Sequence, residues 1–300
     1  MAVRFESKHS VINNVRRIAI EQVDRAILTI EDDRLEREHT VHQVRKHCKK
    51  IRALVRLARP GFEKTFQIEN RWYRDSAKPL AVLRDARIRI ATFDKLVEPF
   101  QKPLEDYALA SIRHRLTLEA TEIRQNVDVD ELLAMVLKRF KKGKKRISGW
   151  EFNATDVRPI KSGLIQVYRQ VQKSLRIAED DPNEQNLHQW RKYVKYHWYH
   201  CRMLRAVGPK SVQIQRQQVQ QLGELLGDAN DLAILADQLR TNPSEYGNPC
   251  TVELFIELID QRRKCLSSFA IDSGRRIFAE KPKRFARQFK AYWKASSSRK

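Results

Sequence analysis

Hydrophobic residues recur at helical spacing through most of the chain, and alternation typical of strands is missing. In the segment 41–59, apolar side chains recur every three or four residues, at Val41, Val44, Cys48, Ile51, Val55 and Ala58. Such a series occupies one face of a helix and is typical of burial against other helices. Two-residue Asn-Gly or Asp-Gly hairpins are also missing. The pattern therefore predicts an all-α protein.

Proline and glycine mark where the predicted helices begin and end. The helix at 41–59 stops at Pro60-Gly61, because proline lacks an amide donor and glycine permits a reversal. Pro79 and Pro103 can each begin a further helix. The segments predicted to be helical are 9–30, 41–59, 61–76, 79–97, 103–125, 128–138, 187–205, 252–269 and 272–294.

The polar face of the helix at 41–59 carries an unbroken row of basic side chains. This first basic row consists of His42, Arg45, Lys46, Lys49, Arg52 and Arg56. At the rise of an α-helix it is about 21 Å long. A surface helix usually mixes acids and bases to gain i,i+4 ion pairs. An unbroken cationic row gains no such pairs and repels itself, so it indicates a binding role.

The same pattern returns 146 residues later, in the segment 187–205. The second basic row consists of His188, Arg191, Lys192, Lys195 and Arg202, each 146 positions after its counterpart. The apolar face returns as Leu187, Trp190, Val194, His197, Cys201 and Leu204. Trp198 stands where the first row has Arg52, so the second row is shorter.

A second motif keeps the same offset. Leu226-Gly227-x-x-Asn230-Asp231 corresponds to Leu80-Ala81-x-x-Arg84-Asp85. Two motifs with one offset indicate an internal duplication and two similar helical bundles. The predicted halves are residues 1–148 and 149–300.

Two other segments are strongly basic. Residues Lys138–Arg146 contain seven basic residues in nine, and we interpret them as a mobile, solvated linker between the halves. The C-terminal tail, Lys281–Lys300, contains eight basic residues and no acid, and its Ser-rich end is expected to fray.

Charge and cysteine usage restrict the partners and the compartment. The 300 residues include 59 Lys and Arg against 37 Asp and Glu, so the net charge of +22 favours a polyanion: nucleic acid, an anionic membrane or a phosphate chain. No stretch approaches 18 apolar residues, so no membrane span is expected. An N-terminus without an apolar signal region and four dispersed cysteines favour the reducing cytoplasm.

Catalytic and metal-binding motifs are missing from the sequence. It contains no GxxxxGK[ST], GxGxxG, GxSxG or HExxH. His188, His197 and His200 lack a further ligand at a familiar zinc spacing, and His197 lies on the apolar face, where a hydrogen-bonded core histidine is expected. We therefore expect a binding protein without enzymatic activity, metal or cofactor.

The repeated histidines and aspartates are further candidates for the site. We interpret His42 and His188 as hydrogen-bond donors to phosphate oxygens. Asp85 and Asp231 have two interpretations: each holds a cation of its row from behind by a charge-assisted hydrogen bond, or each forms a salt bridge elsewhere in its bundle. The first interpretation is preferred, with Arg84 beside them.

The duplicated His-x-x-Arg-Lys-x-x-Lys helix, followed in each half by Leu-[Gly/Ala]-x-x-[Arg/Asn]-Asp, resembles the CHAD domain, a conserved-histidine α-helical domain. The resemblance extends over roughly residues 7–289. It implies two four-helix bundles related by a pseudo-twofold axis, with a basic cavity between them that binds inorganic polyphosphate. Carried over to this chain, the cavity would be lined by His42, Arg45, Lys46, Lys49, His188, Arg191, Lys192 and Lys195.

The expected function is therefore non-catalytic polyphosphate binding in the cytoplasm, with association with polyphosphate granules. The expected ligands of the phosphate chain are both basic rows, including Arg52, Arg56 and Arg202. Trp198 and Asn230 depart from the basic pattern of the first half, which predicts a weaker grip in the second half. The alternatives are a nucleic-acid-binding protein, an enzyme that processes phosphate chains, and a scaffold at a granule or membrane surface.

Overall fold

The structure, a computed structural model, describes residues 3–100, 106–152, 154, 156–208, 210–287 and 289–297. All regular secondary structure in these ranges is helical, which confirms the all-α prediction. The α-helices are α1 (Val11–Glu31), α2 (Arg37–Ala58), α3 (Glu63–Ala77), α4 (Ala81–Val97), α5 (Asp106–Asn126), α6 (Val129–Ile147), α7 (Arg158–Asp180), α8 (Glu184–Leu204), α9 (Lys210–Thr241), α10 (Pro249–Ile277), α11 (Pro282–Phe285) and α12 (Phe289–Ser297). Short 3-10 helices occupy Arg59–Gly61 (η1), Glu98–Phe100 (η2) and Pro243–Tyr246 (η3).

The two basic helices are α2 and α8, and each begins a few residues before the predicted start. The side chain of Asn183 caps α8 by accepting a hydrogen bond from the amide of Asn186 at 2.8 Å. All twelve residues of the two predicted apolar faces are buried, with exposed fractions of 8% or less. Helical periodicity therefore identified the buried faces of both helices correctly.

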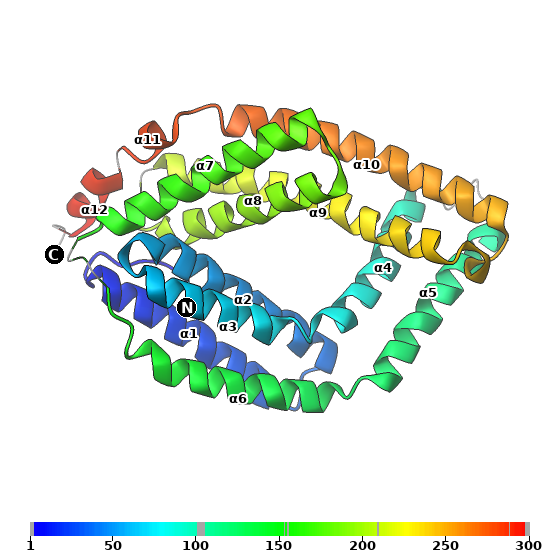
Figure 1. Cartoon of the computed structure of the whole chain (residues 1–300), viewed down its shortest axis with the longest axis horizontal. Helices are drawn as coiled ribbons and strands as arrows, with labels where there is room; N and C mark the ends of the chain where they lie inside the picture. Colours follow the sequence, from blue (N-terminus) through cyan, green and yellow to red (C-terminus); the bar gives the residue numbers. More distant parts are fainter. Residues whose placement is uncertain are drawn as a thin grey trace.

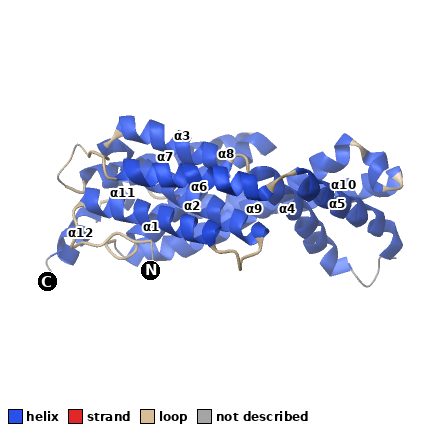
Figure 2. Cartoon of the chain, turned by 90° about the horizontal axis from the view of Figure 1, so that it is seen from below, coloured by secondary structure: helices blue, strands red, loops and turns tan. Residues whose placement is uncertain are grey.

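Two hydrophobic cores organise the molecule, which has a broad part and a narrower arm (Figure 1). The larger core joins α1, α2, α3 and α6 to α7, α8, the start of α9, the end of α10 and the C-terminal helices. The smaller core lies in the arm, where α4 and α5 pack with the second part of α9 and the first part of α10 (Figure 2). Each core contains residues from both sides of position 148. The duplication and the division at that position stay an interpretation of the sequence.

The helix pair α3–α4 differs from α9 in continuity. Helix α3 ends at Ala77 and α4 begins at Ala81 after Pro79, whereas the positions 146 residues later lie inside the uninterrupted α9. The counterpart of Pro79 is Leu225, which keeps its backbone donor and lets the helix continue. One half thus has two helices where the other has one helix of 32 residues.

The prediction that Lys138–Arg146 is a mobile linker is wrong, because these residues form the second half of α6. Phe140, Gly143 and Ile147 are buried at helical spacing. A Cβ atom at Gly143 would lie 2.7 Å from Tyr73 Oη, so glycine permits close packing against α3. Ion pairs also hold the segment: Lys141–Glu31 at 2.7 Å, Lys144–Asp24 at 2.6 Å and Arg146–Glu69 at 2.8 Å.

The basic C-terminal tail is docked on the larger core as far as Ser297. Phe285 and Phe289 are buried. Trp293 packs edge-on against Phe5 near the N-terminus, with 6.1 Å between ring centroids. Part of the segment 295–300 that was expected to fray, residues 298–300, lies outside the described residues.

Candidate functional site: a cationic cluster between α2 and α8

The two basic helices pack directly against each other. His200 Nε2 donates a hydrogen bond to the carbonyl oxygen of Ala53 at 2.9 Å, which joins α8 to the middle of α2. Arg56 stacks on Tyr196 with 4.5 Å between the guanidinium carbon and the ring centroid. These contacts bring the two basic rows, 146 residues apart in the sequence, into one site.

Lys49 lies at the centre of this site and is surrounded by cations from three helices. Desolvation, followed by the charges of four neighbours, lowers the pKa of the Lys49 ammonium to about 7. The neighbours are Arg84 on α4, Arg45 on α2, and Arg191 and Lys195 on α8. We call these five residues the central cluster. Lys49 keeps access to solvent, so desolvation is only partial, and an anion can reach its ammonium group.

The remaining members of the rows meet on either side of the central cluster. Burial and the charges of Arg56 and Arg52 lower the pKa of Lys192. Burial and the charges of Arg202, Lys46 and Arg25 lower the pKa of Lys50 to about 8. Cations of α2 therefore face cations of α8 along the crossing of the two helices.

Lys50 belongs to the site although the sequence analysis left it out. It lies beside the first basic row rather than in it, and its contact with α8 depends on how the helices cross. The Arg56–Tyr196 contact corresponds, at the offset of 146, to the pair Arg202 and Lys50, and the charge of Arg202 acts on Lys50. This relation depends on how α2 packs against α8, so spacing along the chain could not have identified Lys50.

The two repeated histidines lie next to the repeated Leu-[Gly/Ala]-x-x-[Arg/Asn]-Asp motif. Burial and the charges of Lys46, Lys49, Arg84 and His39 lower the pKa of His42. In the other half, His188 Nδ1 lies 2.7 Å from Asn230 Oδ1, and Asn230 is the counterpart of Arg84. Both histidines are exposed, so both are accessible to a ligand.

The repeated aspartates lie on either side of Arg84. Arg84 Nη1 donates a hydrogen bond to Asp85 Oδ1 at 3.0 Å, and Arg84 Nη2 lies 4.0 Å from Asp231 Oδ1. Burial lowers the pKa of Arg45, and the charge of Asp85 opposes that shift. Asp231 acts on Arg191 in the same way. The aspartates therefore hold Arg84 directly and act on the basic rows through their charge.

Several donors in the rows already have partners, and others do not. Arg45 Nη1 donates to the Ala77 carbonyl oxygen at 2.8 Å, and Arg52 Nε donates to Asn70 Oδ1 at 3.2 Å. Within the described part of the chain, Arg56 Nε and Arg191 Nε are buried without a hydrogen-bond partner. A buried donor without an acceptor is unfavourable, so neither guanidinium has all its hydrogen bonds satisfied within the protein.

His197 and His200, which lie outside the rows, are buried and hydrogen-bonded. His197 Nε2 lies 2.9 Å from Gln215 Oε1 and 3.5 Å from Cys201 Sγ, and burial lowers the pKa of this imidazole to about 4. The prediction of a hydrogen-bonded core histidine is confirmed. Among the described residues, no group of three His, Cys, Asp or Glu side chains is arranged to hold a metal ion. None of the described helices is both long enough and apolar enough to cross a membrane.

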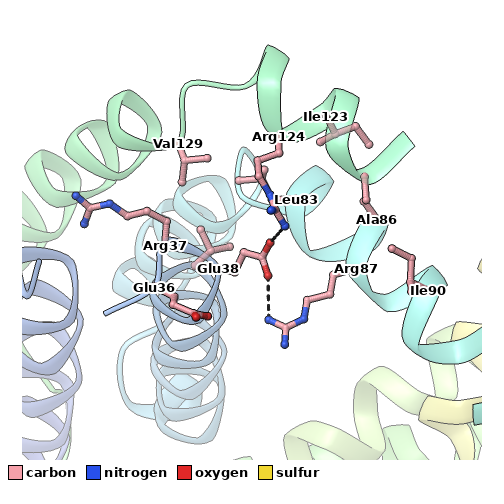
Figure 3. Close-up of a pocket in the computed structure, with 12 residues that line it drawn as sticks. Glu36, Arg37, Glu38, Leu83, Ala86, Arg87, Ile90, Ile123, Arg124 and Val129 are labelled. Atoms are coloured by element: carbon pink, nitrogen blue, oxygen red, sulfur yellow. Dashed lines mark hydrogen bonds and ion pairs between the residues drawn. The ribbon is translucent and has the colours of Figure 1, made fainter. Parts of the chain in front are cut away.

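A pocket of about 640 Å³ lies apart from the central cluster, at the start of α2 beside α4, α5 and α6 (Figure 3). At its mouth Glu38 accepts hydrogen bonds from Arg87, at 3.1 Å, and from Arg124. The apolar lining consists of Val41, Leu83, Ala86, Ile90, Ala120, Ile123 and Val129. No member of either basic row lines this pocket. Its Glu38 connects α2 to α4 and α5 of the arm through the hydrogen bonds from Arg87 and Arg124.

Comparisons with known proteins identify the family and the fold of the chain. The family model of the CHAD domain matches residues 18–240. The crystal structure of the CHAD domain from the plant Ricinus communis is similar to this chain with a TM-score of 0.59 and 13% identity, and the match covers 93% of this chain and 95% of that one. PptA from Streptomyces chartreusis has a TM-score of 0.61 and 13% identity, and the match covers 91% of this chain and 100% of PptA.

No curated protein matches the sequence. At 13% identity, the two solved structures show a shared fold and nothing more. The family match itself extends over well more than half of the chain, from α1 to the end of α9. The chain therefore belongs to the CHAD domain family.

Proposed function

We propose that this protein binds inorganic polyphosphate along the crossing of α2 and α8 and does not catalyse a reaction on it. The observation that carries the proposal is the position of Lys49 among four other cations. Like charges held together destabilise the site without a ligand, because each raises the free energy of its neighbours. A bound polyanion attracts every one of these cations, and this attraction outweighs the repulsion between them, so the clustered charges favour binding.

Phosphate oxygens suit the donors of the site. Guanidinium groups bind them in a bidentate manner, and ammonium groups act as compact point charges. The unpartnered Nε of Arg191 lies in the central cluster, and that of Arg56 lies one turn beyond Arg52 on α2. A chain of identical phosphate units needs no sequence readout, which agrees with a site formed by charge rather than by shaped pockets.

The decisive experiment is isothermal titration calorimetry with polyphosphate on a charge-reversed variant. Lys49→Glu combined with Lys195→Glu should abolish binding while circular dichroism shows unchanged helicity. The matched control is Lys142→Glu with Lys145→Glu, which makes the same change in net charge on the exposed face of α6. Equal losses in the two variants would mean that affinity follows net charge and that the rows are merely solvated faces.

Nucleic acid is the main alternative ligand, and the aromatic residues of the site argue against it. Base stacking needs exposed rings, but Tyr199 is 9% exposed, and Trp198 is only partly exposed, with Lys195 and Arg202 against its ring. Polyphosphate should displace RNA or DNA at a far lower phosphate concentration than the reverse. Release of phosphate during incubation with a divalent metal would instead favour an enzyme.

The proposed place of action is the cytoplasm, at polyphosphate granules. Cys48 and Cys201 are buried free thiols, which suit a reducing compartment. A fluorescent fusion that co-localises with granules, and loses that localisation on Lys49→Glu with Lys195→Glu, would support this placement. A diffuse signal for the unmodified protein would contradict it.

A further inference from the structure

Two glycines on α9 lie directly against two cations of the second basic row. Gly223 and Gly227 are one helical turn apart and buried, and they face Lys195 and Arg191 on α8, which are also one turn apart. A Cβ atom at Gly223 would lie 3.3 Å from Lys195 Nζ and 3.4 Å from its Cε. One at Gly227 would lie 3.6 Å from Arg191 Nη2. Both long side chains therefore lie across the backbone of α9.

Backbone conformation does not explain these glycines. Both lie inside α9, and in the described chain the positive φ that favours glycine occurs only at Gly247. A glycine in a helix interior is less favourable than an alanine. What distinguishes the two positions is the space above them, which the side chains of Lys195 and Arg191 occupy.

The acids of α9 lie beside these glycines. The charges of Glu224, Asp231 and Asp228 oppose the lowering of the pKa of Lys195 that burial and Arg191 cause. All three acids have other partners: Glu224 accepts a hydrogen bond from Gln220 at 3.1 Å, Asp228 pairs with Lys95 at 2.7 Å, and Asp231 lies 4.0 Å from Arg84. The acids thus favour the charged form of Lys195 without holding its ammonium group, which stays available to a ligand.

The first half of the chain holds its equivalent arginine differently. The counterparts of Gly223 and Gly227 are Ala77 and Ala81, where α3 ends and α4 begins. Arg45, the counterpart of Arg191, donates a hydrogen bond to the carbonyl oxygen that the end of α3 leaves free at Ala77. Since α9 continues through this region, its carbonyl groups are bonded within the helix and none is free for Arg191. Gly227 instead leaves room for the Arg191 side chain beside the backbone of α9.

We propose that Gly223 and Gly227 are positioning residues of the ligand site: they form a shallow channel in α9 that directs Lys195 and Arg191 toward Lys49. This inference rests on the proposed polyphosphate binding, because the two cations are placed for that ligand. It predicts that stability and affinity respond in opposite directions when the channel is filled.

The test is Gly223→Ala, with Gln221→Ala on the exposed face of α9 as the matched control. Gly223→Ala should raise the melting temperature by about 2 °C through helix propensity. It should also weaken polyphosphate binding roughly threefold, because Lys195 Nζ must move. Gln221→Ala should change neither. A Gly223→Ala variant that binds as tightly as the unmodified protein would overturn the inference.

A double-mutant cycle separates positioning from general disruption. Gly223→Leu should weaken binding as much as Lys195→Ala does, and the combined variant should lose no more than either alone. Additive losses would show that Gly223 does not act through Lys195 and would overturn the inference.

A second readout works without polyphosphate and keeps the two proposals distinguishable. After ¹³C-methylation of lysines, the NMR signal of Lys195 should shift in Gly223→Ala while that of Lys192 stays in place. If the unmodified protein fails to bind polyphosphate, the proposed function fails, and this signal still decides the role of Gly223. An unmoved Lys195 signal would overturn the inference even if polyphosphate binds.

Discussion

The two basic rows share five equivalent basic positions, but the protein holds these side chains in different ways. In the first row, Arg45 and Arg52 are fixed by hydrogen bonds to α3, at Ala77 and Asn70. In the second row, Lys195 and Arg191 lie against Gly223 and Gly227 of α9, and the charges of the acids of α9 favour their protonated forms. The difference shows that the positions of charges can be kept while their supports change.

The supports also set how strongly each lysine repels its neighbours. After desolvation, the largest causes that lower the pKa of Lys49 are the charges of four cations, whereas at Lys195 the charges of three acids oppose the lowering. Lys49 and Lys195 are counterparts, 146 residues apart. Without a ligand, Lys49 on α2 is therefore repelled by its neighbours more strongly than Lys195 on α8. A bound polyanion should be stabilised more by Lys49 than by Lys195.

Single charge reversals of the two counterpart lysines test this difference most strongly. Lys49→Glu should weaken polyphosphate binding about a hundredfold, or about 2.7 kcal/mol, and Lys195→Glu about tenfold. The reason is that cations of both rows act on Lys49, whereas the charges of three acids already offset part of the repulsion at Lys195. Isothermal titration calorimetry at one salt concentration measures both. Equal losses would show that the two helices contribute alike.

The pH dependence of binding should originate in the same lysine. A polyanion favours the protonated form of Lys49, so its pKa rises on binding and the complex takes up a proton. Affinity is then highest below pH 7 and falls as Lys49 becomes neutral in the free protein. Between pH 6 and pH 8 we expect a loss of about tenfold.

An arginine replacement identifies the group that titrates. Lys49→Arg should remove most of this pH dependence, because arginine stays protonated throughout the range. Lys195→Arg should leave it in place. A profile that stays steep in Lys49→Arg would move the titration to another group, such as His42, whose pKa is also lowered.

Periodicity predicted the fold and the rows because burial and charge repeat with the helix. The spacing of apolar residues was enough to predict the buried faces of α2 and α8. The constant offset of 146 residues showed which cation of one row corresponds to which cation of the other. The continuity of α9 was not predicted, although Leu225 stands where the first half has Pro79.

Other features depend on packing that spacing does not encode. In α6 the density of lysines concealed Phe140, Gly143 and Ile147, which continue the buried face of Leu133 and Val136. Lys50 lies near Arg202 only because α2 crosses α8. The role of Gly223 becomes visible only once Lys195 is seen to lie against it. Such contacts follow from helix positions that one sequence without a partner helix does not specify.

Trp198 allows the weaker second row to be strengthened. Lys195 Nζ and the Arg202 guanidinium lie 5.7 Å and 5.5 Å from its ring centroid, at the position where the first row has Arg52. Trp198→Arg should tighten polyphosphate binding about fivefold. It should also steepen the dependence of log Kd on log salt by about 0.7, by analogy with single-stranded nucleic acids. Trp198→Gln, which removes the ring without adding charge, is the control and should not bind more tightly than the unmodified protein.

The smallest expected effect concerns stability rather than binding, and it compares Arg45 with Arg191. Arg45→Ala removes a charge-assisted hydrogen bond to the C-terminal end of α3, which should reduce the free energy of unfolding by about 1–2 kcal/mol. Arg191→Ala removes an arginine whose Nε has no partner and whose charge repels Lys49 and Lys195, so it should change stability by less than about 0.5 kcal/mol.

Urea denaturation without phosphate measures this pair of variants, and the sign of the difference is what matters. If Arg191→Ala were as destabilising as Arg45→Ala, the α9 channel would be a structural contact equal to the α3 hydrogen bond. The second row would then be fixed as rigidly as the first. A small effect of Arg191→Ala would instead mean that this cation of α8 contributes little to the stability of the fold. Its contribution would then be to the binding of the ligand.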